Sequence, residues 1–131
     1  MNELAILCDK LGINIKEVID AASTKPFGFM SFYSGAGAGG HCIPKDPLFL
    51  LNSSKKYQSN FHTISNALQI NQFMPKYIAD SIEKTLTEMK LPKSVIVCGL
   101  SYKPDTEDMR DSPGFKMVKE LKKNRFDVAV F

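Results

Sequence analysis

Val95-Ile96-Val97-Cys98-Gly99 is a short, wholly apolar run that ends in glycine, and it decides the fold class of the C-terminal part of the chain. Such a run is typical of a strand buried in a parallel sheet. Ser112-Pro113 then predicts the start of a helix that ends near Asn124, and residues 126–131 predict a second strand. Two strands and one helix cannot cover both faces of a parallel sheet, so we expect a β-α-β unit that opens a larger α/β domain.

Before Leu91 the hydrophobic pattern is helical. Leucines at helical spacing lead to Gly12, which should close the first helix, and Asn14 with Glu17 resembles a capping box that opens a second helix through Ala22. Asp46-Pro47 predicts the N-cap and first residue of a third helix. A fourth helix should begin near residue 60 and be kinked or divided at Pro75. Its expected apolar face carries Ile64, Leu68, Asn71, Ile78, Ile82, Leu86 and Met89.

Composition excludes several classes of protein. The 131 residues are 44% hydrophobic with a net charge of +3, which is ordinary for a globular domain and too weakly basic for a nucleic-acid coat. The apolar runs are too short to span a membrane, and no signal peptide opens the chain. Three cysteines suggest a reduced, cytoplasmic setting. We expect Cys8 and Cys98 to be buried, and no metal site, because the cysteines and histidines lack zinc-ligand spacing.

The glycine segment, residues 35–40, directly precedes the residues best suited to catalysis. It lies in a long loop expected over residues 23–46, and it leads into Cys42, Lys45 and Asp46. A nearby lysine and a helix N-terminus favour the thiolate of Cys42, which predicts a nucleophile. Asp46 is either a helix cap, a base for a water molecule, or both. Lys45 is either a solvated lysine or a group that holds an oxyanion.

The same segment matches G-x-G-x-x-G through Gly35, Gly37 and Gly40. That fingerprint binds a dinucleotide only between a strand and a helix, and we expect Pro44 and Pro47 to prevent a helix there. The match is therefore interpreted as a result of glycine density. His41 is expected to be structural.

A second polar cluster, residues 102–113, follows the predicted strand, where open α/β sheets bind ligands. Lys103 and Arg110 are its candidate anion-binding groups. The alternative is a solvated charged loop, because acids outnumber bases there.

Two segments, Gly39 to Pro47 and Gly99 to Pro113, together resemble the UDP-sugar 6-dehydrogenase family, NAD-dependent enzymes that oxidise a sugar C6 alcohol to a carboxylate. Ile70-Asn71 with Met74-Pro75 is a weaker match. Residues 24–30 resemble the branch that acts on UDP-N-acetylhexosamines. The resemblance implies an all-helical central dimerisation domain over residues 1–90 and the beginning of a Rossmann-like UDP-sugar-binding domain over residues 91–131. It also implies an N-terminal NAD domain that these residues do not contain, so the chain alone is expected to be inactive.

The resemblance further implies a role for each matched residue. Cys42 would form a thiohemiacetal and then a thioester with the substrate, and Asp46 would assist the hydrolysing water. Lys45 and Arg110 would lie near NAD, and Lys103 would contact the UDP-sugar. The expected substrate-binding residues are completed by Tyr33, Gly35, Gly37, Gly39 and Gly40. The homodimer would form through the central helices, and the product would serve surface polysaccharide synthesis.

Alternatives remain at this point. Among UDP-sugar 6-dehydrogenases, the alternative to the predicted enzyme is one that acts on UDP-glucose or on UDP-N-acetylmannosamine. Two alternatives from other classes of protein are a helical dimerisation module without catalysis and a thiol-based redox or metal module.

Overall fold

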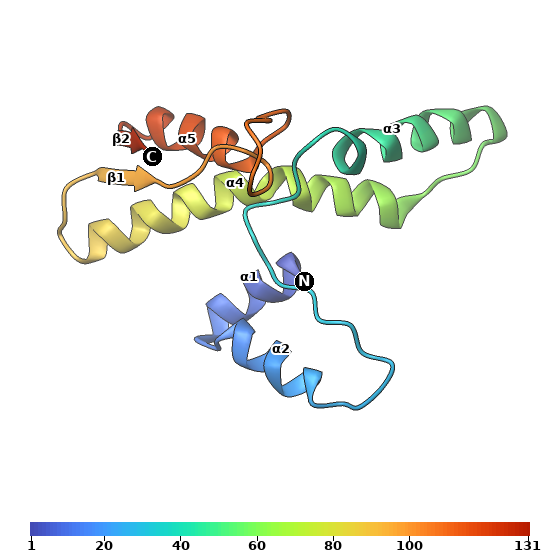
Figure 1. Cartoon of the computed structure of the whole chain (residues 1–131), viewed down its shortest axis with the longest axis horizontal. Coiled ribbons are helices and arrows are strands. Elements are labelled where there is room, and N and C mark those ends of the chain that lie inside the picture. Colours follow the sequence, from blue (N-terminus) through green and yellow to red (C-terminus); the bar gives the residue numbers. More distant parts are fainter. The chain divides into compact units, whose positions relative to one another are not determined.

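The computed structural model describes residues 1–131 (Figure 1). The elements in chain order are α1 Asn2–Leu11, α2 Ile15–Ser23, α3 Cys42–Ser54, the 3-10 helix η1 Lys55–Tyr57, α4 His62–Glu88, β1 Ser94–Val97, α5 Pro113–Lys123 and β2 Asp127–Val130. The chain divides into two compact units, Met1–Gly35 and Ala36–Phe131. No helix is both long and apolar enough to span a lipid bilayer.

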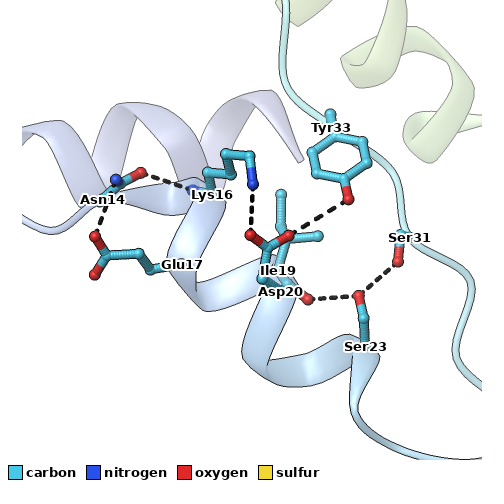
Figure 2. Close-up of polar contacts among 8 residues, drawn as sticks. All are labelled: Asn14, Lys16, Glu17, Ile19, Asp20, Ser23, Ser31 and Tyr33. Atoms are coloured by element: carbon cyan, nitrogen blue, oxygen red, sulfur yellow. Dashed lines mark hydrogen bonds and ion pairs between the residues drawn. The ribbon is translucent and has the colours of Figure 1, made fainter.

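The first unit is a pair of short helices, as expected. Gly12 ends α1 in the left-handed conformation, with φ 68°, and its N–H is bonded to the last carbonyls of the helix. Asn14 is the N-cap of α2 and accepts from the Lys16 N–H at 3.0 Å (Figure 2). Glu17 meets the side-chain amide of Asn14 at 3.2 Å. The predicted cap is confirmed, although the glutamate bonds the cap's side chain instead of its backbone.

The segment that follows α2 is bonded back onto that helix (Figure 2). The hydroxyls of Ser23 and Ser31 lie 2.6 Å apart, and the Tyr33 hydroxyl donates to Asp20 at 3.5 Å. Asp20 is also paired with Lys16 at 2.6 Å. These contacts place the Tyr33 hydroxyl beside Lys16 and Asp20 of α2, within the first unit.

Helix α3 begins earlier than expected, at Cys42, and it contains both Pro44 and Pro47. The prediction that these prolines prevent a helix, and that Asp46 caps one, is wrong. Pro44 is the third residue of the helix, where the N–H has no partner within the helix in any case. Pro47 costs one hydrogen bond, to the Ile43 carbonyl, which a helix of 13 residues tolerates.

Helix α4 is continuous over 27 residues, so Pro75 does not divide it. Of the predicted apolar face, Leu68 is buried and the positions from Ile64 to Leu86 are otherwise half-buried, but Met89 is exposed because it lies beyond the last residue of the helix. Met74, Pro75 and Ala79 are also buried. In Figure 1, α3 lies along the first half of α4 and α5 along the second half. The long helix therefore supports both of the segments in which chemistry was expected.

The C-terminal residues form the predicted β-α-β unit. Strands β1 and β2 are parallel, with a register from Ser94 opposite Asp127 to Val97 opposite Val130. The Ser112 hydroxyl accepts from the Phe115 N–H at 3.3 Å and so caps α5. The core of this unit is built from Ala79 of α4 together with Val97, Val118, Leu121 and Phe126. The predicted division at residues 90 and 91 stays a prediction, although α4 contributes to this core.

The cysteines differ from expectation. Cys98 is exposed and Cys8 is only partly buried. Cys98 follows the last residue of β1, and the outer face of the two-stranded sheet is uncovered, since Ile96 is 69% exposed. The apolar run therefore identified the strand correctly but not the burial of the residue after it.

Candidate active site

Cys42 is the first residue of α3, and its thiol is exposed. Asp46 lies four residues later, which places both side chains on one face of the helix. The two residues line one open groove of about 550 Å³, called here the Cys42 groove. Its remaining lining residues are apolar: Ile43, Pro47, Leu50 and Ile64. A thiol and a carboxylate thus share a mostly apolar concave surface.

Cys42 lies in the first turn of α3, where backbone N–H groups have no partner within the helix. Asp46 is the fifth residue of α3 and so is free of any capping role; the N-cap is His41, whose side chain makes no capping hydrogen bond. His41 is exposed, and no histidine lies in the Cys42 groove.

Lys45 connects this turn to the second polar cluster. Its ammonium group lies 3.4 Å from a carboxylate oxygen of Asp111, and Lys116 lies 3.3 Å from the other oxygen. Burial acts to raise the pKa of Asp111, but the hydrogen bonds and charges of Lys116 and Lys45 outweigh it and hold the pKa below its ordinary value. The sequence argument placed Lys45 in the site but did not find Asp111.

Arg110 is bound to the carboxylate of Asp108. Its Nε lies 3.0 and 2.9 Å from the two oxygens, and its Nη2 lies 2.6 Å from one of them. These hydrogen bonds raise the pKa of Arg110, and smaller electrostatic contributions come from Tyr102 and Cys42. Lys103 is exposed and lies over the Tyr102 ring, 5.5 Å from its centroid.

Removing the Arg110 guanidinium should return the Asp108 carboxyl toward its ordinary pKa. The hydrogen bonds from Arg110 lower the pKa of Asp108 from 3.8 to about 2. Since this folded-state pKa is depressed, the stabilising contribution is present above about pH 4 and is lost as the pH falls toward 2. We expect Arg110→Gln to return the pKa toward 3.8, measured by NMR titration of the Asp108 carboxyl. Arg125→Gln, at an exposed arginine, is the control, and an Asp108 pKa that stays near 2 in Arg110→Gln would contradict the assignment.

Three glycines before Cys42 are explained by close packing. A Cβ at Gly39 would lie 2.8 Å from the Pro113 ring and 2.9 Å from the Tyr102 Cβ, and one at Gly40 would lie 2.9 Å from the Tyr102 ring. A Cβ at Gly37 would meet the backbone oxygen of Asn71 at 2.9 Å. Gly40 is buried with φ 86°, and its N–H donates to the Arg110 carbonyl at 2.8 Å. The expected sugar-lining role of these glycines stays a prediction, and packing is an independent reason for them.

Gly35 differs from the other three glycines. No atom lies within 4 Å of the Cβ that it lacks, and it belongs with Tyr33 to the first unit. The G-x-G-x-x-G match is not a dinucleotide-binding turn, because residues 24–41 contain no strand before α3 begins. Nor does the structure hold a group of three or more His, Cys, Asp or Glu side chains placed to bind a metal ion.

Comparison with known proteins gives consistent matches. Residues 1–73 match the UDP-glucose/GDP-mannose dehydrogenase family, central domain, and residues 96–131 match the UDP binding domain of that family. The chain is similar to the UDP-N-acetyl-D-mannosamine dehydrogenase of Pyrococcus horikoshii, with 35% identity over 99% of this chain and 31% of that protein. It is also similar to the NDP-N-acetyl-D-galactosaminuronic acid dehydrogenase of Ralstonia solanacearum, with 34% identity over 92% of this chain and 27% of that protein.

Solved structures agree with these matches. The UDP-D-ManNAc dehydrogenase from Pyrococcus horikoshii aligns with a TM-score of 0.85 and 36% identity, over 98% of this chain and 31% of that chain. A UDP-glucose dehydrogenase from Pyrobaculum islandicum aligns with a TM-score of 0.83 and 28% identity, over 98% of this chain and 30% of that chain. The chain spans about 30% of the length of these relatives. Because the central-domain match alone covers more than half of its residues, the chain belongs to the UDP-glucose/GDP-mannose dehydrogenase family.

Proposed function

We propose that the chain is the nucleophile-bearing part of an NAD-dependent UDP-N-acetylhexosamine 6-dehydrogenase. The observation that carries this proposal is that Cys42 and Asp46 lie on one face of α3 and line one groove. Lys45, from the same turn, is paired with Asp111 of the segment that matches the UDP binding domain. A nucleophile, a carboxylate and a cation thus stand beside the segment that would hold the nucleotide-sugar.

The reaction removes four electrons from the sugar C6. The alcohol loses a hydride and a proton to become an aldehyde, and the Cys42 thiolate adds to the aldehyde carbon to give a thiohemiacetal. Loss of a second hydride leaves a thioester, which water hydrolyses to the carboxylate and the free thiol. Asp46 would take a proton from that water, and Lys45 would stabilise the oxyanions that form before and after the thioester.

NAD would accept the two hydrides. Among this chain's residues, two cations would lie at the edge of such a cofactor: the exposed guanidinium of Arg110, and Lys45, which lies in the same helix turn as the Cys42 thiol. Cations suit the pyrophosphate of a dinucleotide. The 131-residue chain by itself should produce no NADH, because no dinucleotide-binding turn is present among these residues.

The substrate class is drawn from residues 24–30 and from the relatives. Proteins named for UDP-N-acetylmannosamine and NDP-N-acetylgalactosaminuronic acid are 33–38% identical to this chain, which supports an N-acetylhexosamine over glucose. Lys103 would contact the UDP-sugar from the exposed edge of the second cluster. Glycines 35, 37, 39 and 40 with Tyr33 would line the sugar site, and the product would serve surface polysaccharide synthesis.

The two-domain division at residues 90 and 91, a homodimer through the central helices and a cytoplasmic location complete the proposal. The exposed leucines of α1, Leu4, Leu7 and Leu11, are available apolar surface for such a dimer. Sedimentation velocity over a range of concentrations would measure it.

NADH production by the protein of the complete reading frame that contains these residues tests the function. The protein would be offered UDP-GlcNAc, UDP-GalNAc, UDP-ManNAc and UDP-glucose in turn. We expect two NADH per sugar with one N-acetylhexosamine. One NADH per sugar would remove the thioester step from the proposal. A folded protein that produces none with any sugar would contradict the dehydrogenase assignment and favour the helical dimerisation module.

A further inference from the structure

We infer that Asn71 is a positioning residue, which holds the backbone at Ala38 and so fixes the path of the chain into Cys42. Its side-chain oxygen accepts from the Ala38 N–H at 2.6 Å, and its side-chain nitrogen donates to the Ala38 carbonyl at 2.9 Å. The carboxamide therefore pairs with both polar groups of one residue, as a neighbouring strand would. For its effect on turnover this inference rests on the proposed function, while the hold on Ala38 stands by itself.

The place of Asn71 in α4 is unusual for its residue type. It lies between Leu68 and Met74, on the face that packs against the rest of the chain, where an apolar residue is expected. It also borders a cavity of about 430 Å³ whose other lining residues are Ile43, Pro47, Thr63, Ile64, Ala67 and Leu68. In such apolar surroundings a hydrogen-bonded pair is strengthened and an unpaired amide is costly. Asn71 is thus suited to hydrogen bonding with Ala38, whereas an apolar side chain would suit packing against this cavity better.

The backbone of α4 is adapted to the same contact. Pro75 has no N–H to donate to the Asn71 carbonyl, so the helix lacks a hydrogen bond there. Gly37 lies against that carbonyl, where a Cβ would approach to 2.9 Å from the backbone oxygen and 3.2 Å from the side-chain oxygen. The loop therefore approaches α4 closely at the carbonyl that Pro75 leaves without a helix hydrogen bond.

Two points of attachment then define the start of α3. Ala38 is held by Asn71 of α4, and two residues later the Gly40 N–H is held by the Arg110 carbonyl at 2.8 Å. Cys42 begins the helix two residues after that. Because no more than four residues separate the first attachment from the sulfur-bearing residue, loosening it should move the nucleophile relative to Asp46 and Lys45. A displacement of about 1 Å in a catalytic group is enough to lower a rate substantially.

Amide hydrogen exchange at Ala38 tests the hold directly. In Asn71→Ala we expect the protection factor of the Ala38 amide to fall on the order of tenfold or more. Gln72→Ala, at the adjacent exposed amide of α4, is the matched control and should change protection by less than about twofold. Protection across α5 and β2 reports whether the rest of the unit stays folded. Unchanged protection at Ala38 in a folded Asn71→Ala would overturn the inference.

Asn71→Asp separates hydrogen bonding from volume, because the two side chains have nearly the same shape. At neutral pH the carboxylate still accepts from the Ala38 N–H, but it cannot donate to the Ala38 carbonyl, and its second oxygen repels that carbonyl. The protection of Ala38 should therefore fall, by less than in Asn71→Ala. Once protonated, near pH 4 or below, the carboxyl again offers one donor and one acceptor, and protection should recover relative to the intrinsic exchange rate. A merely space-filling role would give no such recovery, so its absence would contradict the inference.

Turnover by the complete protein completes the test. We expect Asn71→Ala to lower kcat about tenfold or more while KM for the UDP-sugar changes less than about threefold, because the nucleophile moves and the nucleotide site does not. If the protection of the Ala38 amide falls in Asn71→Ala but kcat is unchanged, Asn71 does not position the nucleophile. If the unaltered protein oxidises no UDP-sugar, the proposed function fails, and the protection of Ala38 alone decides whether Asn71 holds the loop.

Discussion

Cys42→Ser should remove nearly all dehydrogenase activity from the complete protein. A serine hydroxyl is far less ionised than a thiol at neutral pH, so it adds poorly to the aldehyde and gives an ester in place of a thioester. We expect kcat for NADH production to fall on the order of a thousandfold, with a smaller change in KM for the UDP-sugar. Initial rates and the NADH yield per sugar measure the effect.

Cys98→Ser is the matched control for that experiment. Both thiols are exposed, but Cys98 lies after β1 and does not line the Cys42 groove. Its replacement should change kcat by less than about twofold. Equal losses in the two variants would indicate a general requirement for thiols, and a Cys42→Ser protein with normal turnover would remove Cys42 from the mechanism.

Gly39→Ala should destabilise the fold through close packing alone, because Gly39 has no positive φ. The new Cβ would lie 2.8 Å from the Pro113 Cδ, 2.9 Å from the Tyr102 Cβ and 3.0 Å from the Asp111 carbonyl oxygen. None of these atoms is the far end of a flexible side chain, so the backbone of one segment must move. We expect the free energy of unfolding to fall by about 2–3 kcal/mol, measured by urea denaturation.

Gly35→Ala isolates the packing effect. Neither glycine has a positive φ, and nothing lies within 4 Å of the Cβ that Gly35 lacks. The backbone change is therefore the same in kind, and only the neighbours differ. Gly35→Ala should alter the free energy of unfolding by less than about 0.5 kcal/mol. Equal effects of the two substitutions would mean that the approach of Pro113 and Tyr102 to Gly39 is not tight in solution.

Local signals predicted most of the secondary structure. The cap at Asn14, the stop at Gly12 and the cap at Ser112 are confirmed because each depends on hydrogen bonds between residues close in the chain. The error at α3 has a local cause as well. The sequence argument excludes a helix that contains both Pro44 and Pro47, whereas Pro44 in the first turn removes no hydrogen bond and Pro47 removes only one.

The site was predicted in part. Cys42, Lys45 and Asp46 were visible as a nucleophile, a cation and a carboxylate after a glycine-rich run, and α3 brings all three into its first turns. Asn71 and Asp111 were not assigned a role there, because their partners lie 33 and 66 residues away in the chain. The signals available for Asn71 were a polar residue in an apolar helix face and the weaker family match at Ile70-Asn71.

The sequence by itself determined the helical first part, the β-α-β unit and, through two motifs in order, the family, and it predicts Cys42 as the nucleophile. Only the tertiary structure decided why glycines stand at positions 37, 39 and 40, since their neighbours Asn71, Tyr102 and Pro113 are distant in the chain. It also decided that Lys45 is paired with Asp111 and that Ala38 is held by Asn71. Capping and hydrophobic periodicity act over a few residues and can be detected in a linear pattern. Backbone approach and ion pairing require two distant segments to meet, and a single sequence does not specify which ones.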